Sequence, residues 1–310
     1  MRFKKLDLNL LVALDVLLTE RNVSRAAAKL FMSQSATSGA LARLREYFGD
    51  DLLVQVGRRM VLTPRAQALA AKVRAVLMQI DGTIIQPPDF DPATVERTIR
   101  IAASDYVVVA GLDRALRSIR QKAPGLTILL EPPRGDPSTL LVQGEIDLLA
   151  MPEVYLAQDH PSVEYFTDEY VVIACAANPM FGETLTREDF FEARHVGMRL
   201  SSHTPGYEAW FVKNAGAERR FSVVAGSFMA VPFLVIGTES IALLQGRLAR
   251  VFAQFLPLRI LPCPIDIPPL TEHLQWHLFS ENDACLTWVR DEILAVREGI
   301  GPADIAHRID

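Results

Sequence analysis

Short polar side chains gather on one face of a helix that the sequence predicts over residues 34–48. Gln34, Ser35 and Ser38, in the first turns of this helix, are expected on its exposed polar face, and the apolar Leu41 and Leu44 on its buried face. A glutamine amide can pair bidentately with adenine in the major groove, and a serine hydroxyl can reach bases or phosphates. This pattern therefore predicts a helix that presents a hydrogen-bonding surface to duplex DNA.

Arginines flank this surface. Arg43 and Arg45 lie at its sides, where a guanidinium holds phosphates rather than reads sequence. Arg58 and Arg59 form the tip of a hairpin expected over 52–62, beside the DNA backbone or in the minor groove. The alternative for each arginine is a solvated surface side chain. The expected DNA-binding residues are Ser33, Gln34, Ser35, Ser38, Arg43, Arg45, Arg58 and Arg59.

The charge of the chain is unevenly distributed. The total is −5, but residues 1–80 hold 13 Lys/Arg and 6 Asp/Glu, a net of +7, whereas residues 81–310 have a net of −12. Positive charge confined to the first quarter attracts phosphates whatever the total is. A modest basic segment is also compatible with an ordinary solvated surface.

Three helices and a hairpin are expected to position the DNA-contacting residues, as a winged helix-turn-helix domain over 6–63. Its helix-turn-helix motif is expected at 23–42. Ser24 and Ser33 are plausible N-caps for the second and third helices, because serine accepts from a backbone N–H of the first turn. Gly49 is expected to end the third helix.

A further helix is expected in the linker at 64–88, with Thr63 and Pro64 as a start signal and Pro87-Pro88 as a stop. Its apolar residues are spaced 4, 3 and 4 apart, as at the a and d positions of a coiled coil. This spacing favours dimerisation, and a plain core helix is the alternative. The residues of this seam are Leu69, Val73, Val76 and Ile80.

From residue 97 onward, apolar strand-like and helix-like segments alternate, which predicts an α/β fold with parallel strands. Strands are expected at 98–103, 126–131, 146–150, 171–176, 195–198, 221–225, 240–244, 258–263 and 275–279. Helices are expected between them, beginning at 106–122 and ending at 286–296. The fold class is thus α/β with an all-α-rich winged helix-turn-helix N-terminal domain.

The cysteines and the N-terminus bear on location. Cys175, Cys263 and Cys285 are few and odd in number, which argues against a disulfide framework or a structural zinc site. The apolar start of the chain is interrupted by Asp7 and Asp15, which a secretion signal would not carry. No apolar run approaches the roughly 18 residues of a membrane span. We therefore expect a cytoplasmic protein with no metal, no cofactor and no membrane partner.

The segments SRAAAKL, SQSATSGALARLREYFGDDLL and LTPRAQAL resemble the LysR-type transcriptional regulators, and the similarity extends over essentially the whole chain. MRFKKLDLNLLVALD, LTERNV and LTEHLQW resemble the NodD-like branch, whose members answer plant flavonoids. One departure concerns the recognition helix, where the family usually has proline and this chain has Ser35. A proline would pre-set the backbone; serine instead offers a hydroxyl, so site preference is expected to differ.

The resemblance implies an effector-binding domain over 89–310, made of two α/β subdomains like those of type II periplasmic binding proteins. Subdomain I would comprise about 97–168 with 276–310, and subdomain II about 170–274. A small aromatic or phenolic effector would bind between them, with core packing or surface exposure as the alternative for each residue. The expected effector-binding residues are Ser104, Asp105, Tyr106, Met151, Asp168, Glu169, His203, Thr204, Phe228, Met229, Gln245 and Trp276.

The resemblance also implies partners: promoter DNA, RNA polymerase and further copies of the chain, as a dimer of dimers. Two other classes of protein were weighed. An enzyme would be expected to show a motif such as G-x-S-x-G, H-E-x-x-H or a P-loop, and the sequence contains none. A cytoplasmic small-molecule-binding protein without a regulatory role would not need the basic N-terminal unit.

Overall fold

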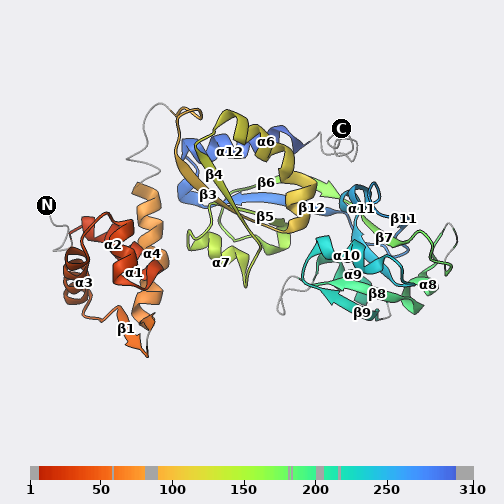
Figure 1. Ribbon diagram of the computed structural model, residues 1–310, viewed down its shortest axis with the longest axis horizontal. Coiled ribbons are helices and arrows are strands. Elements are labelled where there is room, and N and C mark those ends of the chain that lie inside the picture. The colour runs from red at the N-terminus through yellow and green to blue at the C-terminus, as the bar shows by residue number, and fades with distance from the viewer. Residues whose placement is uncertain are drawn as a thin grey trace. The chain divides into compact units, whose positions relative to one another are not determined.

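The computed structural model describes residues 7–57, 59–80, 90–180, 182, 184–199, 206–215 and 218–297 (Figure 1). The chain divides into two compact units. The first comprises residues 1–88 with 139–145 and 277–284, and the second comprises 89–138, 146–276 and 285–310. The first unit carries the predicted DNA-contacting helix, and the second carries two β-sheets.

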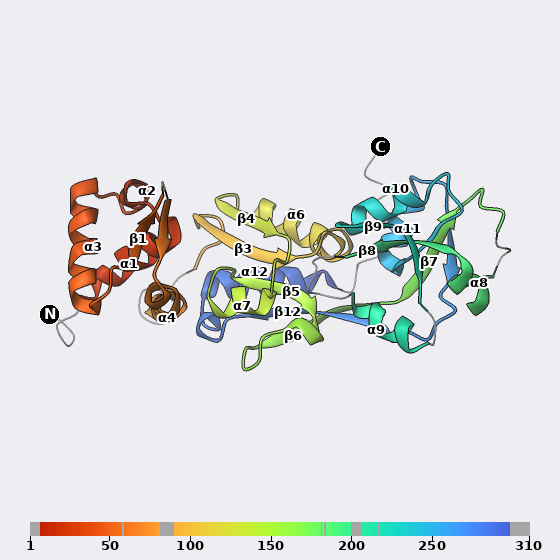
Figure 2. The same ribbon diagram turned by 90° about the horizontal axis from the view of Figure 1, so that it is seen from below.

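Residues 7–80 form four helices and a two-stranded antiparallel hairpin (Figure 2). Their shared core contains Leu14, Leu17 and Leu44, all inaccessible to solvent. The leucine stripe of the first helix thus packs against the apolar side of the third, as amphipathic helices do. The elements are α1 (Asn9–Glu20), α2 (Val23–Lys29), α3 (Gln34–Phe48), β1 (Leu53–Val56), β2 (Arg59–Leu62) and α4 (Pro64–Ile80).

Local signals define the helix ends. Ser33 Oγ accepts from the Ala36 N–H and caps α3, while Gly49 ends that helix with φ +60°. Thr63 Oγ1 accepts from a backbone N–H of α4. The prediction for α2 was wrong by two residues: Asn22, rather than Ser24, caps the helix by accepting from the Arg25 N–H. Asparagine is as good an N-cap as serine, so sequence preference alone did not separate them.

The first large sheet has the order β4-β3-β5-β12-β6. Strands β3, β4 and β5 are parallel, and β12 runs antiparallel to both β5 and β6. We call this sheet and its helices lobe I. Its strands are β3 (Arg97–Ala103), β4 (Leu126–Glu131), β5 (Leu148–Pro152), β6 (Ser162–Asp168) and β12 (Leu270–Trp276). The helical segments of lobe I are α5 (Asp105–Val107), η2 (Val108–Leu112), α6 (Asp113–Lys122), η3 (Glu153–Tyr155) and α12 (Ala284–Ala295). Most of α7 (Pro137–Val142) and all of η5 (Leu278–Ser280), which follow β4 and β12, belong to the first unit.

The second large sheet, in lobe II, has the order β11-β7-β10-β8-β9. Strands β8, β9 and β10 pair in parallel, and β7 is antiparallel to β10 and β11. Both sheets are therefore mixed rather than wholly parallel as predicted. The strands are β7 (Tyr170–Cys175), β8 (Arg194–Met198), β9 (Arg220–Ala225), β10 (Ile241–Gln245) and β11 (Leu258–Pro262). The helical segments are α8 (Arg187–Glu192), α9 (Tyr207–Asn214), η4 (Phe228–Ala230), α10 (Val231–Val235) and α11 (Gly246–Phe252).

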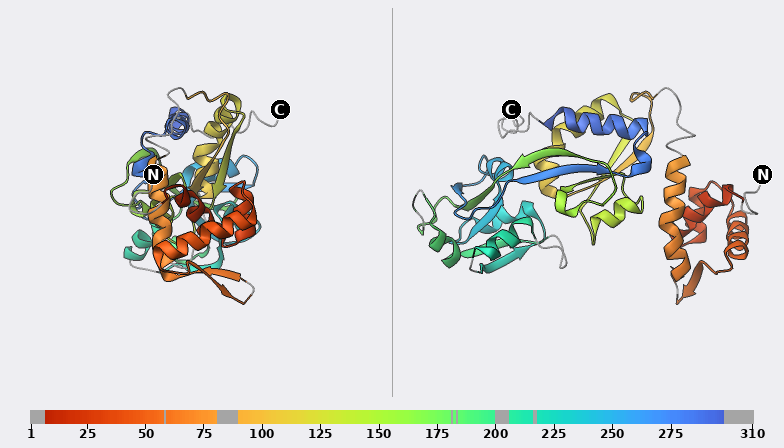
Figure 3. Two further views of the ribbon diagram at one scale, coloured as in Figure 1. Left: turned by 90° about the vertical axis from the view of Figure 1, so that its left-hand side faces the viewer. Right: turned by 180° about the vertical axis from the view of Figure 1, so that it is seen from behind.

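The chain passes twice between the lobes, at Glu169 and over residues 263–269. Figure 3 shows the green β6 and the blue β12 lying side by side where these passages meet lobe I. The strand expected at 275–279 is instead β12, which begins at Leu270 and lies wholly in lobe I. The boundary expected near 274–276 was therefore too late. Strand β12 shows no alternation, because its polar residues Glu272, His273 and Gln275 are buried.

One hydrophobic core extends through both lobes. It joins Ile99 and Ile101 of β3 to Ile173 of β7 and Leu244 of β10. Such shared packing ties the lobes into one unit. Within the described part of the chain, none of the helices is both long and apolar enough to cross a bilayer.

Candidate functional site

The polar face of α3 is open to solvent. Gln34, Ser35 and Ser38 are exposed, whereas Thr37 and Leu44 on the opposite side are inaccessible. The hydroxyls of Ser33 and Ser35 lie 3.0 Å apart, and Ser33 also caps the helix. Ser35 stands where the family usually has proline, and the start of α3 is nevertheless capped in the ordinary way by Ser33. The predicted division of α3 into a core side and a free polar side is confirmed.

The two arginines of α3 have different partners. Arg43 pairs with Asp7 at 2.8 Å and remains half-exposed, and this hydrogen bond lowers the pKa of Asp7. Arg45 donates to the backbone carbonyls of Asp51 and Leu53, each at 2.7 Å. We expected Arg45 to contact phosphate, and its contacts correct that expectation. Its guanidinium is held by the segment that leads into the hairpin.

At the hairpin itself, Arg59 is exposed on β2. Arg58 lies outside the described residues. An exposed guanidinium on a two-stranded hairpin can neutralise a phosphate.

A cavity of about 40 Å³ lies between the two lobes. Aromatic rings dominate its walls: Tyr170 and Tyr207 are parallel with centroids 6.3 Å apart, and Tyr106 and Phe228 have centroids 5.9 Å apart. The lining residues from lobe I are Ser104, Tyr106, Met151, Pro152, Tyr155, Leu270 and Glu272. Those from lobe II are Tyr170, Met198, Gly206, Tyr207, Glu208, Phe228 and Gln245.

Two polar residues in this wall are almost fully buried. Glu272 and Gln245 are each 2% exposed. Among the described residues, neither Glu272 Oε2 nor Gln245 Oε1 has a hydrogen-bond partner. Burial, and then the nearby charge of Asp168, raises the pKa of Glu272 to about 8. A carboxyl group in this environment favours its neutral form.

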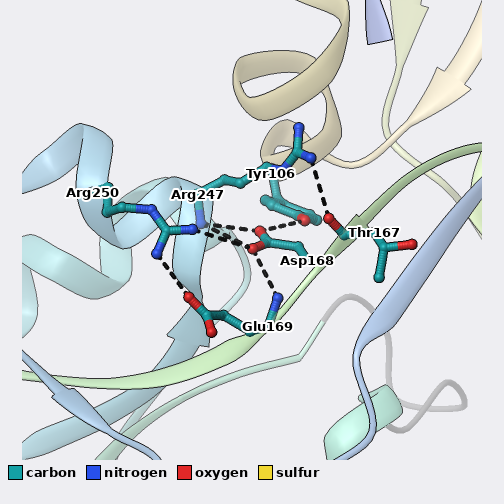
Figure 4. Close-up of polar contacts among 6 residues, drawn as sticks. All are labelled: Tyr106, Thr167, Asp168, Glu169, Arg247 and Arg250. Carbon is teal, nitrogen blue, oxygen red and sulfur yellow. Dashed lines mark hydrogen bonds and ion pairs between the residues drawn. The ribbon is translucent and has the colours of Figure 1, made fainter. Parts of the chain in front are cut away.

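The passage between β6 and β7 is held by a polar cluster (Figure 4). The Asp168 carboxylate accepts from Tyr106 Oη at 2.8 Å and from the Arg247 N–H at 3.0 Å. Glu169 pairs with Arg250 at 2.8 Å. Burial raises the pKa of Asp168 although these hydrogen bonds oppose that change. Tyr106 belongs to lobe I and Arg247 to lobe II, so Asp168 is hydrogen-bonded to both lobes at the passage from β6 to β7.

A second carboxylate joins the lobes directly. Asp105 of lobe I accepts from Ser227 Oγ at 2.5 Å and from the backbone N–H groups of Phe228 and Met229 at 3.4 and 3.3 Å. The donors belong to lobe II, beside the cavity wall at Phe228. Separating the lobes would break these hydrogen bonds.

Comparison with known proteins identifies the architecture. The model of the lysR family of bacterial regulatory helix-turn-helix proteins matches residues 8–67, and that of the LysR substrate binding domain matches residues 92–298. The chain belongs to the LysR family. Its members are transcriptional regulators rather than enzymes, and they bind promoter DNA and small-molecule effectors and form oligomers.

Relatives of this LysR-type regulator are similar over its whole length. Nodulation protein D 2 of Rhizobium tropici is 40% identical over 95% of this chain and 94% of its own. Nodulation protein D 1 of Bradyrhizobium elkanii is 39% identical over 98% and 97%. A solved probable transcriptional regulator of Pseudomonas aeruginosa is 30% identical, with a TM-score of 0.69 over 94% of this chain and 97% of its own.

The structure gathers five of the expected effector-binding residues around the cavity of this LysR-type regulator. These are Ser104, Tyr106, Met151, Phe228 and Gln245. Ser104 Oγ also accepts from the Val107 N–H and caps α5. His203 and Thr204 lie outside the described residues.

The other expected residues do not line this cavity. Asp105 and Asp168 join the lobes, as described above, and Met229 packs against the core. Glu169 borders a separate groove with Arg250 and the segment 260–267. The Cζ atom of Arg290 lies 3.9 Å from the ring centroid of Trp276, and Trp276 packs against the hydrophobic core. It was chosen for its aromatic ring, but it follows Glu272 by four residues and lies farther along the strand.

Sequence reasoning missed several residues of the cavity wall. Tyr155, Tyr170, Tyr207, Met198 and Glu272 were not singled out. One signal was available for Glu272, which is the only acid in the segment LTEHLQW. Tyr170 directly follows the Asp168-Glu169 crossing that was noticed.

The linker helix also corrects an expectation. Leu69 and Val73 of α4 pack into the core of their own helix-turn-helix unit. The plain core helix, which was the alternative, therefore accounts for these two positions. Val76 is 44% exposed and Ile80 is half-buried.

Proposed function

We propose that this regulator binds promoter DNA through the exposed face of α3 and the β1–β2 hairpin. Gln34, Ser35 and Ser38 would contact bases, and Arg43 and Arg59 would contact phosphates. The observation that carries this assignment is the separation of α3 into a buried apolar side and a free polar side. The protein would act in the cytoplasm at the nucleoid, as a dimer of dimers that contacts RNA polymerase.

We further propose that a small aromatic, phenolic effector binds between the lobes. Tyrosine and phenylalanine rings supply stacking surfaces, methionine sulfur adapts to ring edges, and buried acceptors can receive hydroxyls. The name shared by the curated relatives, Nodulation protein D, also supports a flavonoid-like effector through the resemblance noted in the sequence.

The size of the cavity suggests how the effector would signal. At about 40 Å³ it is far smaller than the roughly 300–1,000 Å³ of typical ligand sites. An effector of several rings would therefore move the lobes or the wall side chains. The hydrogen bonds of Asp105 are the contacts that such motion would disturb. A ligand changes activity only through its different affinity for two such arrangements.

A gel-shift experiment tests DNA recognition, using the DNA upstream of the gene itself. Gln34→Ala should weaken specific binding by about 1–3 kcal/mol and relax one base position. Gln67→Ala is the matched control, because Gln67 is exposed on α4 rather than on α3. Unchanged sequence preference in the Gln34 variant would contradict the assignment. Adding flavonoids, phenols and simple carboxylates in turn tests the effector, and a response to carboxylates alone would contradict that part.

A further inference from the structure

Two acceptor atoms in the cavity wall lack partners within the described chain: Glu272 Oε2 of β12 and Gln245 Oε1 at the end of β10. They come from different sheets and different lobes, yet both border the same small cavity. Each side chain is 2% exposed, so bulk water does not satisfy them.

Leaving such groups unpaired is unfavourable for the protein alone. A buried acceptor without a donor loses its hydration and gains nothing in return. The surrounding described side chains supply no donor to these two atoms: the Tyr106 hydroxyl donates to Asp168 instead, and the Arg219 guanidinium pairs with Glu208 at 3.2 Å. Methionine or leucine would fill either position without this penalty. The two acceptors are therefore placed for a donor that comes from outside the chain.

Charge restricts the chemistry of that donor. Glu272 lies near the buried Asp168, whose charge further raises its pKa, and Glu208 also borders the cavity. No lysine or arginine is among the described residues that line it. Glu272 itself is neutral at pH 7, but a ligand carboxylate would still enter beside the carboxylates of Asp168 and Glu208 without a lining cation to pair with, which is unfavourable in a buried site.

We propose that Glu272 and Gln245 are the specificity-determining pair of the cleft and select an uncharged planar ligand with at least two hydrogen-bond donors. This inference rests on the proposed effector site and deepens it, because it states which ligands the site accepts and refuses. One donor group binds Glu272 and another binds Gln245. The ligand thus bridges lobe I to lobe II through the two contacts.

Thermal melting of the full chain without ligand is the first test. Glu272→Met and Gln245→Met keep a similar volume and remove the unpaired acceptor, so each variant should melt at or above the temperature of the unmodified chain. Thr271→Val is the control, since Thr271 lies on β12 outside the cavity and contacts Thr167. A fall of several degrees in both methionine variants would show that the two side chains serve the fold, and would overturn the inference.

Calorimetry with matched probes is the second test. The probes are a dihydroxyflavone with one hydroxyl at each end, its dimethyl ether, and benzoate. The unmodified chain should bind the dihydroxyflavone roughly 10- to 100-fold more tightly than the ether, because the ether offers no donor to the buried acceptors. Glu272→Met and Gln245→Met should each reduce this preference, while Thr271→Val should retain it.

The outcomes separate this inference from the proposed function. If both methionine variants keep the full preference for the hydroxylated probe, the assigned pair is wrong although the cleft still binds an aromatic effector. If the unmodified chain binds benzoate most tightly, the aromatic, phenolic effector fails together with this inference. Loss of preference in the variants, with binding of the ether unchanged or stronger, supports the pair.

Discussion

Three carboxyl groups around the cleft, of which Asp168 and Glu272 are buried and Asp105 is half-buried, show how partners determine the role of a residue. Asp105 accepts from a hydroxyl and two backbone N–H groups of lobe II, and Asp168 accepts from Tyr106 and the Arg247 backbone. Both carboxylates therefore hold the lobes together. Glu272 has an oxygen without a partner and faces the cavity. Burial raises the pKa of Glu272 to about 8, so the fold disfavours its ionisation.

Stability should depend on pH through Glu272. Its folded pKa of about 8 exceeds the ordinary value of 4.5, so between these values only the folded chain holds the proton. The free energy of unfolding then falls as pH rises, by about 1.4 kcal/mol per pH unit at most, and levels off above the folded pKa. Glu272→Met removes this dependence.

Denaturant melts of both proteins at several pH values check this expectation. The difference in free energy of unfolding, variant minus unmodified chain, should grow from weakly acid to weakly alkaline pH. His195 contributes in the opposite direction, because burial lowers its pKa to about 4, but it is present in both proteins and cancels. A difference that stays constant with pH would mean that Glu272 ionises normally in the folded state.

At the scale of the element, α3 serves both the fold and the proposed DNA contact. Thr37, Ala40 and Leu44 bury its inner side, and the outer side carries the short polar residues. The two arginines of α3 likewise differ, one serving the fold and the other remaining exposed. Arg45 fastens the helix to the start of the hairpin, whereas Arg43 keeps an exposed guanidinium beside Asp7.

The two arginine variants should therefore have different effects. Arg45→Ala should lower the stability of the helix-turn-helix unit by about 1–3 kcal/mol, because two backbone carbonyls lose a charged donor. Arg43→Ala should change stability little, since exposed ion pairs contribute little, but should weaken DNA binding and reduce its salt dependence. Melting curves and gel shifts at several salt concentrations measure both effects. Equal destabilisation by the two variants would contradict this division.

At the scale of the whole molecule, the second unit consists of two lobes joined by two crossing segments and a shared core. Ligand control requires two arrangements of such lobes that differ in energy by a few kcal/mol. The Asp105 contacts with Ser227, Phe228 and Met229 are a small set that closure makes and opening breaks. They connect the cavity wall to the relative position of the lobes.

Removing this carboxylate should loosen the contact between lobes. In Asp105→Ala the amide hydrogens of Phe228 and Met229 lose their acceptor, and their exchange with solvent should accelerate about tenfold or more. Asp113→Ala is the control, because Asp113 pairs with Arg117 within α6. Hydrogen exchange followed by mass spectrometry of the 226–235 segment reports the result. Unchanged exchange there would show that core packing alone keeps the lobes closed.

The sequence by itself determined the local order of this protein. Helices and strands along most of the chain, the capped start of α3, its two-sided character and the family follow from patterns within a few residues, such as Ser33, Gly49 and the leucines. Those signals are local because helix caps and periodic apolar faces depend on near neighbours. The start of β12 was missed because its polar residues are buried, and β6 was missed because its buried Tyr165 and Phe166 are adjacent and so break the alternation.

Only the tertiary structure decided which residues meet. Glu272 and Gln245 line one cavity although they belong to strands of different sheets. The ring of Trp276 packs against the Arg290 guanidinium, and Arg45 donates to backbone carbonyls rather than to solvent. The tertiary structure also placed Val73 in the core of its own unit although its spacing suited a coiled coil. The physical reason is that burial and hydrogen-bond pairing belong to contacts between distant segments. Residue type and spacing state what a side chain can do, and packing selects what it does.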